Sequence, residues 1–158
     1  MQHITLPVFH DDDRLATREV LEVEPVAKNQ YRLLHSPAYV EGVAAGDVIE
    51  LDQSLRSEFR LVSRAGNLAV IAAFEKPEAE CSSQAKLLEE SIQTIGGVVE
   101  GGPGRVLVLT VPASCGFHAV ESLLEVLMRE VPGTKWWYGN VCEAGDPSQP
   151  LNWWDDAR

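Results

Sequence analysis

Short strand-like segments separated by polar and turn-forming residues fill the first 66 positions of the chain. Asp, Asn, Ser, Pro and Gly stand between them, and no segment here has the three- and four-residue spacing of a helix. This pattern predicts strands at 3–9, 19–25, 30–34, 47–51 and 58–63. We therefore expect a small antiparallel sheet or open barrel in this part of the chain.

The pattern changes after Gly66, where long apolar runs alternate with amphipathic stretches. Apolar residues recur every three or four positions over 82–95 and 117–131, which predicts two helices, the second with Ser114 as its N-cap. The remaining apolar segments predict strands at 68–74, 98–100, 105–111 and 135–141. This order of strands and helices is that of a ferredoxin-like βαββαβ unit.

The predicted fold class is α+β, with a β-rich segment at 1–66, a ferredoxin-like unit at 67–142 and an acidic, tryptophan-containing tail at 143–158. Both faces of the C-terminal sheet are apolar, because the runs LAVIAAF and VLVLTV place apolar residues on alternate sides. Two helices cover only one of these faces. The N-terminal segment, a second copy of the chain and a ligand are the alternatives for covering the other face, and adjacency in sequence favours the N-terminal segment.

The small-residue stretch GVAAGD at 42–47 raises the question of a phosphate-binding loop. Such a loop needs a Lys-Ser/Thr pair and a following helix, whereas a strand follows Gly46 here and the carboxylate of Asp47 would repel phosphate. We interpret the stretch as a turn in which Asp47 caps the backbone beside a permissive Gly46.

Charge narrows the classes of partner. The chain of 158 residues has 13 Lys and Arg against 24 Asp and Glu, a formal net charge of -11. We expect no nucleic acid partner and, among proteins, a basic one, although acidity also serves solubility. No apolar run is long enough to cross a bilayer and no signal peptide is evident, so we expect no membrane association and a cytoplasmic location. The oligomeric state is not determined by these features, and we expect either a monomer or a homodimer.

No strong catalytic or metal-binding motif stands out. Cys115 lies near the predicted start of the second helix, where the helix dipole lowers a thiol pKa, and His118 follows one turn later. The cluster His10-Asp11-Asp12-Asp13 lacks the spacing of a calcium loop, and the three cysteines form no Cys-x-x-Cys pair. We expect no metal and no other cofactor.

Aromatic residues are the most suggestive candidates for binding. Period-two alternation on the predicted last strand sends Trp136 and Tyr138 to one face and Trp137 to the other. A second tryptophan pair lies in the acidic tail, which either folds back onto the sheet or binds a partner. The interface candidates are Trp136, Trp137, Tyr138, Trp153, Trp154, Asp155 and Asp156.

These features favour a non-enzymatic protein-binding module, for which an acidic inhibitor or immunity-type protein with a basic partner is a suitable model. The first alternative is a small-ligand-binding or regulatory ferredoxin-like domain. The second alternative is a thiol enzyme that uses Cys115 and His118.

Several short motifs resemble a bacterial family known as domain of unknown function 4265. They are Tyr31-Arg32-Leu33, Ser36-Pro37-x-Tyr39, Gly42-Val43-Ala44-x-Gly46-Asp47-Val48-Ile49, Ile95-Gly96-Gly97 and Trp136-Trp137-Tyr138. The resemblance spans roughly residues 20–141 and implies a bacterial origin and a two-part layout. It assigns no catalytic residue, because the family has none assigned.

Overall fold

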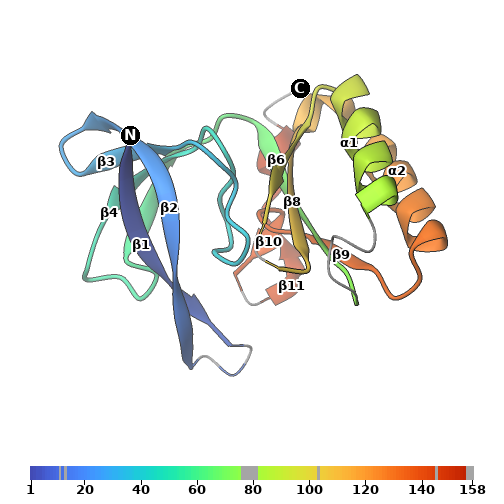
Figure 1. Ribbon diagram of the computed structural model, residues 1–158. Helices are drawn as coiled ribbons and strands as arrows, with labels where there is room; N and C mark the ends of the chain where they lie inside the picture. Colours follow the sequence, from blue (N-terminus) through green and yellow to red (C-terminus); the bar gives the residue numbers. More distant parts are fainter. Residues whose placement is uncertain (11, 13, 76–81, 103, 145, 156–158) are drawn as a thin grey trace.

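The computed structural model describes residues 1–158 except 11, 13, 76–81, 103, 145 and 156–158. The protein is α+β, as predicted, and consists mostly of antiparallel sheets with two helices. Figure 1 shows the two larger sheets side by side, with both helices on the outer side of the second sheet. Neither helix in the described part of the chain is long and apolar enough to span a membrane.

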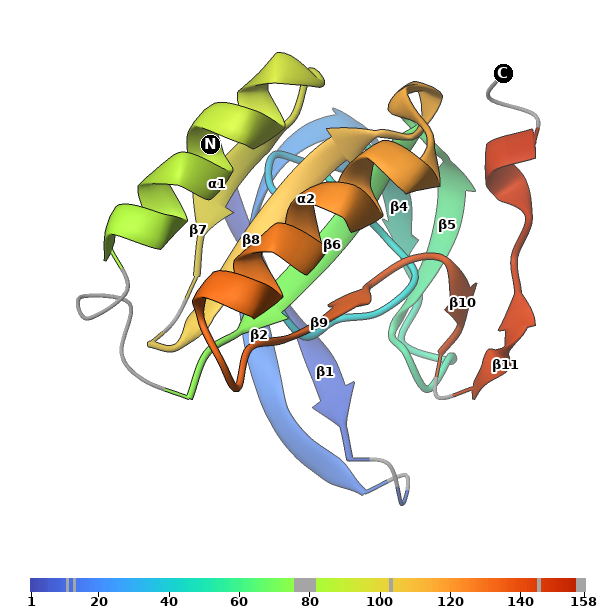
Figure 2. The same ribbon diagram turned by 90° about the vertical axis from the view of Figure 1, so that its right-hand side faces the viewer.

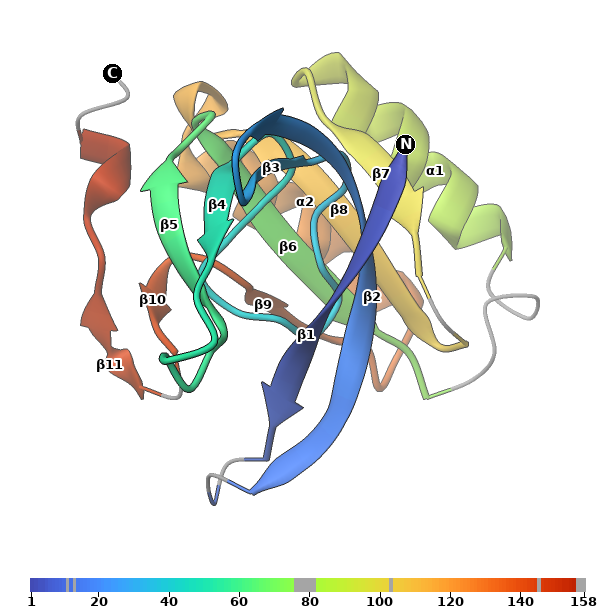
Figure 3. The ribbon, with the colours of Figure 1, turned by 90° about the vertical axis from the view of Figure 1, so that its left-hand side faces the viewer.

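The N-terminal half is a five-stranded antiparallel sheet in which the strands pair in chain order. Its strands are β1 (Gln2–Phe9), β2 (Leu15–Ala27), β3 (Gln30–Leu33), β4 (Val48–Leu51) and β5 (Phe59–Ser63). The hairpin of β1 and β2 extends beyond the other strands (Figure 3). Alternate residues of these strands and of the β3–β4 connection form one buried core: Ile4, Leu6, Leu21, Val23, Leu33, Val40, Val43 and Ile49.

The C-terminal half is a four-stranded antiparallel sheet in the order β7-β8-β6-β9. Its elements are β6 (Asn67–Ala73), α1 (Ser82–Thr94), β7 (Val98–Gly101), β8 (Val106–Pro112), α2 (Phe117–Glu130) and β9 (Lys135–Tyr138). The two strands with the longest apolar runs, β6 and β8, occupy the centre of the sheet. Figure 2 shows α1 and α2 lying across one face of this sheet.

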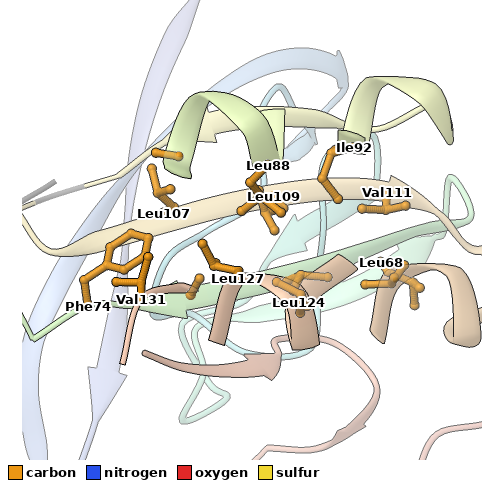
Figure 4. Close-up of a cluster of buried hydrophobic side chains, with 14 residues drawn as sticks. Leu68, Phe74, Leu88, Ile92, Leu107, Leu109, Val111, Leu124, Leu127 and Val131 are labelled. Atoms are coloured by element: carbon orange, nitrogen blue, oxygen red, sulfur yellow. The ribbon is translucent and has the colours of Figure 1, made fainter. Parts of the chain in front are cut away.

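A dense apolar core joins the two helices to the sheet (Figure 4). Leu68 and Leu109 come from the central strands, Ile92 from α1 and Leu124 from α2, and all four are fully buried. Each such side chain stabilises the fold by about 1.5–3 kcal/mol through the removal of apolar surface from water. This core fixes the helices on one face of the sheet only.

The opposite, helix-free face of the same sheet is also buried, and the connection between β3 and β4 covers it. Figure 1 shows this connection running between the two sheets. The Ser36 Oγ lies 2.6 Å from the Thr110 Oγ1 on β8, and the Gly42 N–H donates to the Gly139 carbonyl oxygen at 2.8 Å. Residues of the N-terminal half therefore contact this face at both sides of the sheet.

The GVAAGD stretch ends this connection in a turn, as predicted. The Asp47 N–H donates to the Ala44 carbonyl, and the Asp47 carboxylate accepts the N–H of Ala44 at 3.0 Å and of Ala65 at 2.9 Å. Burial raises the pKa of Asp47, while the two N–H groups and the Arg64 guanidinium at 3.7 Å act in the opposite direction. Asp47 thus ties the turn to the start of β6.

Gly46→Ala is expected to lower the free energy of unfolding by about 2–4 kcal/mol. Gly46 has a φ of 88°, and an added Cβ would stand 2.6 Å from the Cβ of Ala65. Gly42→Ala is the matched control, because Gly42 has a φ of 91° but nothing within 4 Å of an added Cβ. Urea unfolding of both variants separates the clash from the backbone strain. Equal losses in the two variants would show that the contact with Ala65 is unimportant.

The start of α2 differs from the sequence prediction. Ser114 is not its N-cap, because Ser114 lies in the short 3-10 helix η2 (Ala113–Cys115). Gly116 occupies the N-cap position with a φ of 86° and without a side-chain hydrogen bond. The chain needs a left-handed residue to pass from η2 into α2, and glycine adopts that conformation without strain.

The last strand is shorter than predicted, since β9 ends at Tyr138 instead of 141. Beyond it, the side chain of the fully buried Asn140 replaces the strand pairing. Its Oδ1 accepts the Ala69 N–H at 2.9 Å, and its Nδ2 donates to the Asn67 carbonyl at 2.8 Å. A side-chain amide can satisfy a strand in this way because it carries both a donor and an acceptor.

Candidate functional site

The predicted aromatic interface residues are brought together, but most of them pack within the chain. Trp136 and Tyr138 lie on the helix-covered face and pack against its core. Their rings meet edge to face at 5.2 Å, and Tyr138 meets Phe117 of α2 at 5.3 Å. The Tyr138 hydroxyl donates to Glu121, and burial together with that carboxylate raises the pKa of Tyr138 well above its ordinary value. These two side chains support the fold.

The tail folds back onto its own chain. After the hairpin of β10 (Cys142–Glu143) and β11 (Asp146–Pro150) it ends in η3 (Trp153–Asp155) along one side of the molecule (Figure 2). The Trp153 Nε1 donates to the Asn140 carbonyl at 2.8 Å, and its ring lies 5.0 Å from the Arg64 guanidinium.

Trp154 completes this aromatic cluster, at 5.2 Å from the ring of Phe117 and 5.8 Å from that of Trp153. Of the two acidic candidates in the tail, Asp155 is exposed and Asp156 lies outside the described residues. The structure therefore shows the tail bound in cis through its tryptophans.

Trp137 is the predicted aromatic that stays on the surface, with 44% of its area exposed. It stands on the helix-free face, directly opposite Ile71, which in turn stands opposite Val108 on β8. Trp137, Ile71 and Val108 thus form a row across three neighbouring strands, which lie roughly 5 Å apart. Only the Trp137 end of this row is exposed, because Ile71 and Val108 are buried.

At the Val108 end of the row, a groove of about 250 Å³ separates the two sheets. It is lined by 19–22 of β2, by 100–102 and Val108 of the C-terminal sheet, and by His35, Ser36 and Ala38 of the β3–β4 connection. Val20 supplies an apolar side chain on the β2 wall and is 62% exposed. Residues of both halves of the chain therefore line this groove.

Carboxylates dominate the chemistry of this groove. The Glu22 carboxylate lies 3.0 Å from His35 Nε2 and 3.7 Å from His3 Nε2, and Glu100 lies 3.7 Å from His35 Nδ1. Glu19 is occupied, because it accepts three successive backbone N–H groups at 38–40. Within the described part of the chain, no Lys or Arg forms an ion pair with Glu22 or Glu100. The groove therefore carries acidic charge whose basic neighbours, among the described residues, are histidines and not Lys or Arg.

The thiol candidate lacks the expected activation. Burial raises the pKa of Cys115, the reverse of the lowering that a helix N-terminus was predicted to cause. The Cys115 Sγ donates to the Gly116 carbonyl at 3.5 Å, and none of the described hydrogen bonds joins it to His118, which is exposed. A nucleophilic cysteine acts as its thiolate, so this arrangement weighs against the thiol-enzyme alternative.

A metal centre is not evident either. No group of three His, Cys, Asp or Glu side chains suited to a metal ion occurs among the residues that the structure describes. Two members of the His10–Asp13 cluster, Asp11 and Asp13, lie outside those residues.

Sequence reasoning missed the groove residues. Glu22 lies on β2 and Glu100 on β7, and they line one groove only because the β3–β4 connection joins the two halves. A useful signal in the sequence was Ser36 of the Ser36-Pro37-x-Tyr39 motif, whose backbone N–H donates to the Glu100 carboxylate.

The family resemblance is confirmed, whereas the comparisons indicate no activity. A crystal structure of a hypothetical protein from Neisseria gonorrhoeae is similar to this chain, with a TM-score of 0.67 and 13% sequence identity. The match covers 87% of this chain and 93% of that one, so the shared fold includes both halves. No curated protein matches the chain. The family model described as domain of unknown function (DUF4265) matches residues 19–136, and the chain belongs to that family.

Proposed function

We propose that the protein is a non-enzymatic protein-binding module whose groove between the two sheets receives a basic segment of a partner protein. The observation that carries this proposal is the pair of carboxylates, Glu22 and Glu100, that line the groove without a Lys or Arg partner in the described chain. A Lys or Arg side chain from a partner supplies the missing charge, and the exposed Val20 offers an apolar surface beside it.

Long-range charge supports the same proposal. The net charge of -11 attracts a basic protein and accelerates its association, and it disfavours nucleic acid. Trp137 supplies an exposed aromatic anchor on the same face of the C-terminal sheet. An acidic inhibitor or immunity-type protein that occludes a basic enzyme fits this recognition chemistry. The thiols of Cys115 and Cys142 are free, which supports residence in the reducing cytoplasm.

The proposal includes a finer description of the fold, an open barrel packed on a ferredoxin-like unit. The antiparallel strand order β7-β8-β6-β9, with a helix in each crossover, supports the ferredoxin-like part. Contact between Arg18 of β2 and Glu58, just before β5, supports a sheet that curls into an open barrel. The groove then lies at the seam between the two units.

Measured binding tests the proposal. Capture from a lysate of the source organism, followed by titration of the identified protein, is expected to yield a basic partner whose affinity falls as NaCl rises from about 50 to about 500 mM. Glu22→Gln with Glu100→Gln is expected to weaken binding about tenfold or more, while keeping oxygens that accept hydrogen bonds. Trp137→Ala is expected to weaken it as well.

The matched control is Glu89→Gln with Glu90→Gln, which removes the same charge from exposed positions of α1. If the α1 pair weakens binding as much as the groove pair, the partner responds to net charge alone. Binding that is indifferent to salt, to Trp137→Ala and to both charge pairs refutes the proposal.

A further inference from the structure

A second hollow, of about 510 Å³, lies away from the groove, where the tail meets the junction of the two halves. It is lined by 64–67 between β5 and β6, by Pro112 and Ser114 after β8, and by Trp153 of the tail. Three separate parts of the chain thus build one concave surface. Mixed lining by an aromatic ring, a proline and a few polar groups is typical of small-molecule sites.

The charge of this hollow is opposite to that of the molecule. Arg64 is the one charged residue among the described residues that line it, in a chain with a net charge of -11. Its side chain is 17% exposed and lies over the Trp153 ring. A guanidinium held against an aromatic face is fixed in orientation and keeps its charge.

The hydrogen bonds of Arg64 are largely unused. A guanidinium has five N–H donors, and the described structure gives one of them an acceptor, the Gly42 carbonyl oxygen at 3.1 Å. The nearby Asp47 carboxylate is 3.7 Å away, beyond hydrogen-bond distance, and its oxygens already accept the N–H groups of Ala44 and Ala65. Arg64 therefore retains N–H donors at the lining of the hollow, and a guanidinium is a group that can bind a planar carboxylate through two parallel bonds.

We propose that this hollow binds a small organic carboxylate, with the acid group on Arg64 and an apolar or aromatic part against Trp153 and Pro112. Ser114 is exposed at the lining and has no described hydrogen-bond partner, so its hydroxyl can donate a further bond to the acid. The site is separate from the acidic groove and corresponds to the small-ligand alternative. Because Trp153 both lines the hollow and holds the tail, a bound carboxylate stabilises the docked tail.

Benzoate is the test probe, and benzamide is its uncharged analogue. Titration of tryptophan fluorescence, together with the shift of the thermal unfolding midpoint, is expected to show saturable binding of benzoate and none of benzamide at the same concentrations. Inorganic phosphate and acetate are titrated in the same way as two further probes. We expect both to bind more weakly than benzoate, because they lack the apolar part that rests on Trp153.

Variants at the rim keep the fold while changing the charge of the site. Ser114→Lys is expected to tighten benzoate binding and Ser114→Asp to weaken it, each by about tenfold. The reason is that position 114 lines the hollow, so its charge acts on the bound carboxylate at short range. Neither variant should shift the unfolding midpoint without ligand, because Ser114 is exposed. Glu100→Gln in the groove should leave benzoate binding unchanged, which separates the two sites.

Three results would refute the proposal that this hollow binds an organic carboxylate. One is equal binding of benzoate and benzamide, and another is benzoate affinity that does not respond to the two Ser114 variants. The third is phosphate binding as tight as that of benzoate, which would indicate a plain anion site without the apolar contact. Loss of benzoate binding in Arg64→Gln with retained fold, seen by circular dichroism, is the expected supporting result.

Discussion

Asp47→Ala is expected to lower the free energy of unfolding by about 3–5 kcal/mol, as breaking a buried ion pair does. Asp47 is 1% exposed, and its carboxylate accepts two backbone N–H groups and faces Arg64. Alanine leaves the Ala44 N–H unsatisfied in a buried turn, removes the acceptor of the part-buried Ala65 N–H and removes the carboxylate that faces the guanidinium. Urea unfolding followed by circular dichroism measures the loss.

Asp146→Ala is the matched control, because Asp146 also accepts a backbone N–H, from Ser148 at 3.0 Å, but is exposed. We expect that variant to lose about 1 kcal/mol or less. Asp47→Asn should fall between the two, since the amide keeps one acceptor oxygen but places an NH₂ group against the other donor. Similar losses for Asp47→Ala and Asp146→Ala would show that Asp47 is not a structural link between the turn and β6.

The regular elements were predictable because their signals are local. In β6 and β8 the apolar run is continuous, which identifies a strand buried on both faces, and both strands are central. The helices α1 and α2 follow the three- and four-residue spacing of their buried side chains. The β10–β11 hairpin was missed because its second strand, DPSQP, is fully exposed and has two prolines.

The binding surfaces were not predictable because they depend on contacts between distant segments. Tryptophan at 153 indicates an aromatic contact, but its partner in cis is set by Arg64 and by the carbonyl of Asn140. In the same way, Glu22 and Glu100 read as ordinary solvated acids until their strands face each other across the groove. Hydrophobic periodicity and secondary-structure propensity describe residues that are neighbours along the chain. These sites arise instead where the two halves of the chain meet.

Replacing Ile71 with aspartate is expected to prevent folding. Ile71 is 1% exposed on the helix-free face, so the variant loses a buried side chain, worth about 2–5 kcal/mol, and adds an unpaired buried carboxylate. The lost burial and the cost of the buried carboxylate together reach the total free energy of unfolding of a typical domain, about 5–15 kcal/mol. Ile71→Ala keeps the protein foldable and gives a measurable loss of about 2–5 kcal/mol in urea.

Trp137→Asp places the same carboxylate on the same face, on the strand next to Ile71, but at the exposed end of the row. We expect that variant to fold and to lose about 1–2 kcal/mol, because only part of its indole is covered. A difference between the two variants follows only if residues of the N-terminal half cover the centre of the sheet. Equal, mild effects would mean that water reaches Ile71, and the groove between the two sheets would then lose one of its walls.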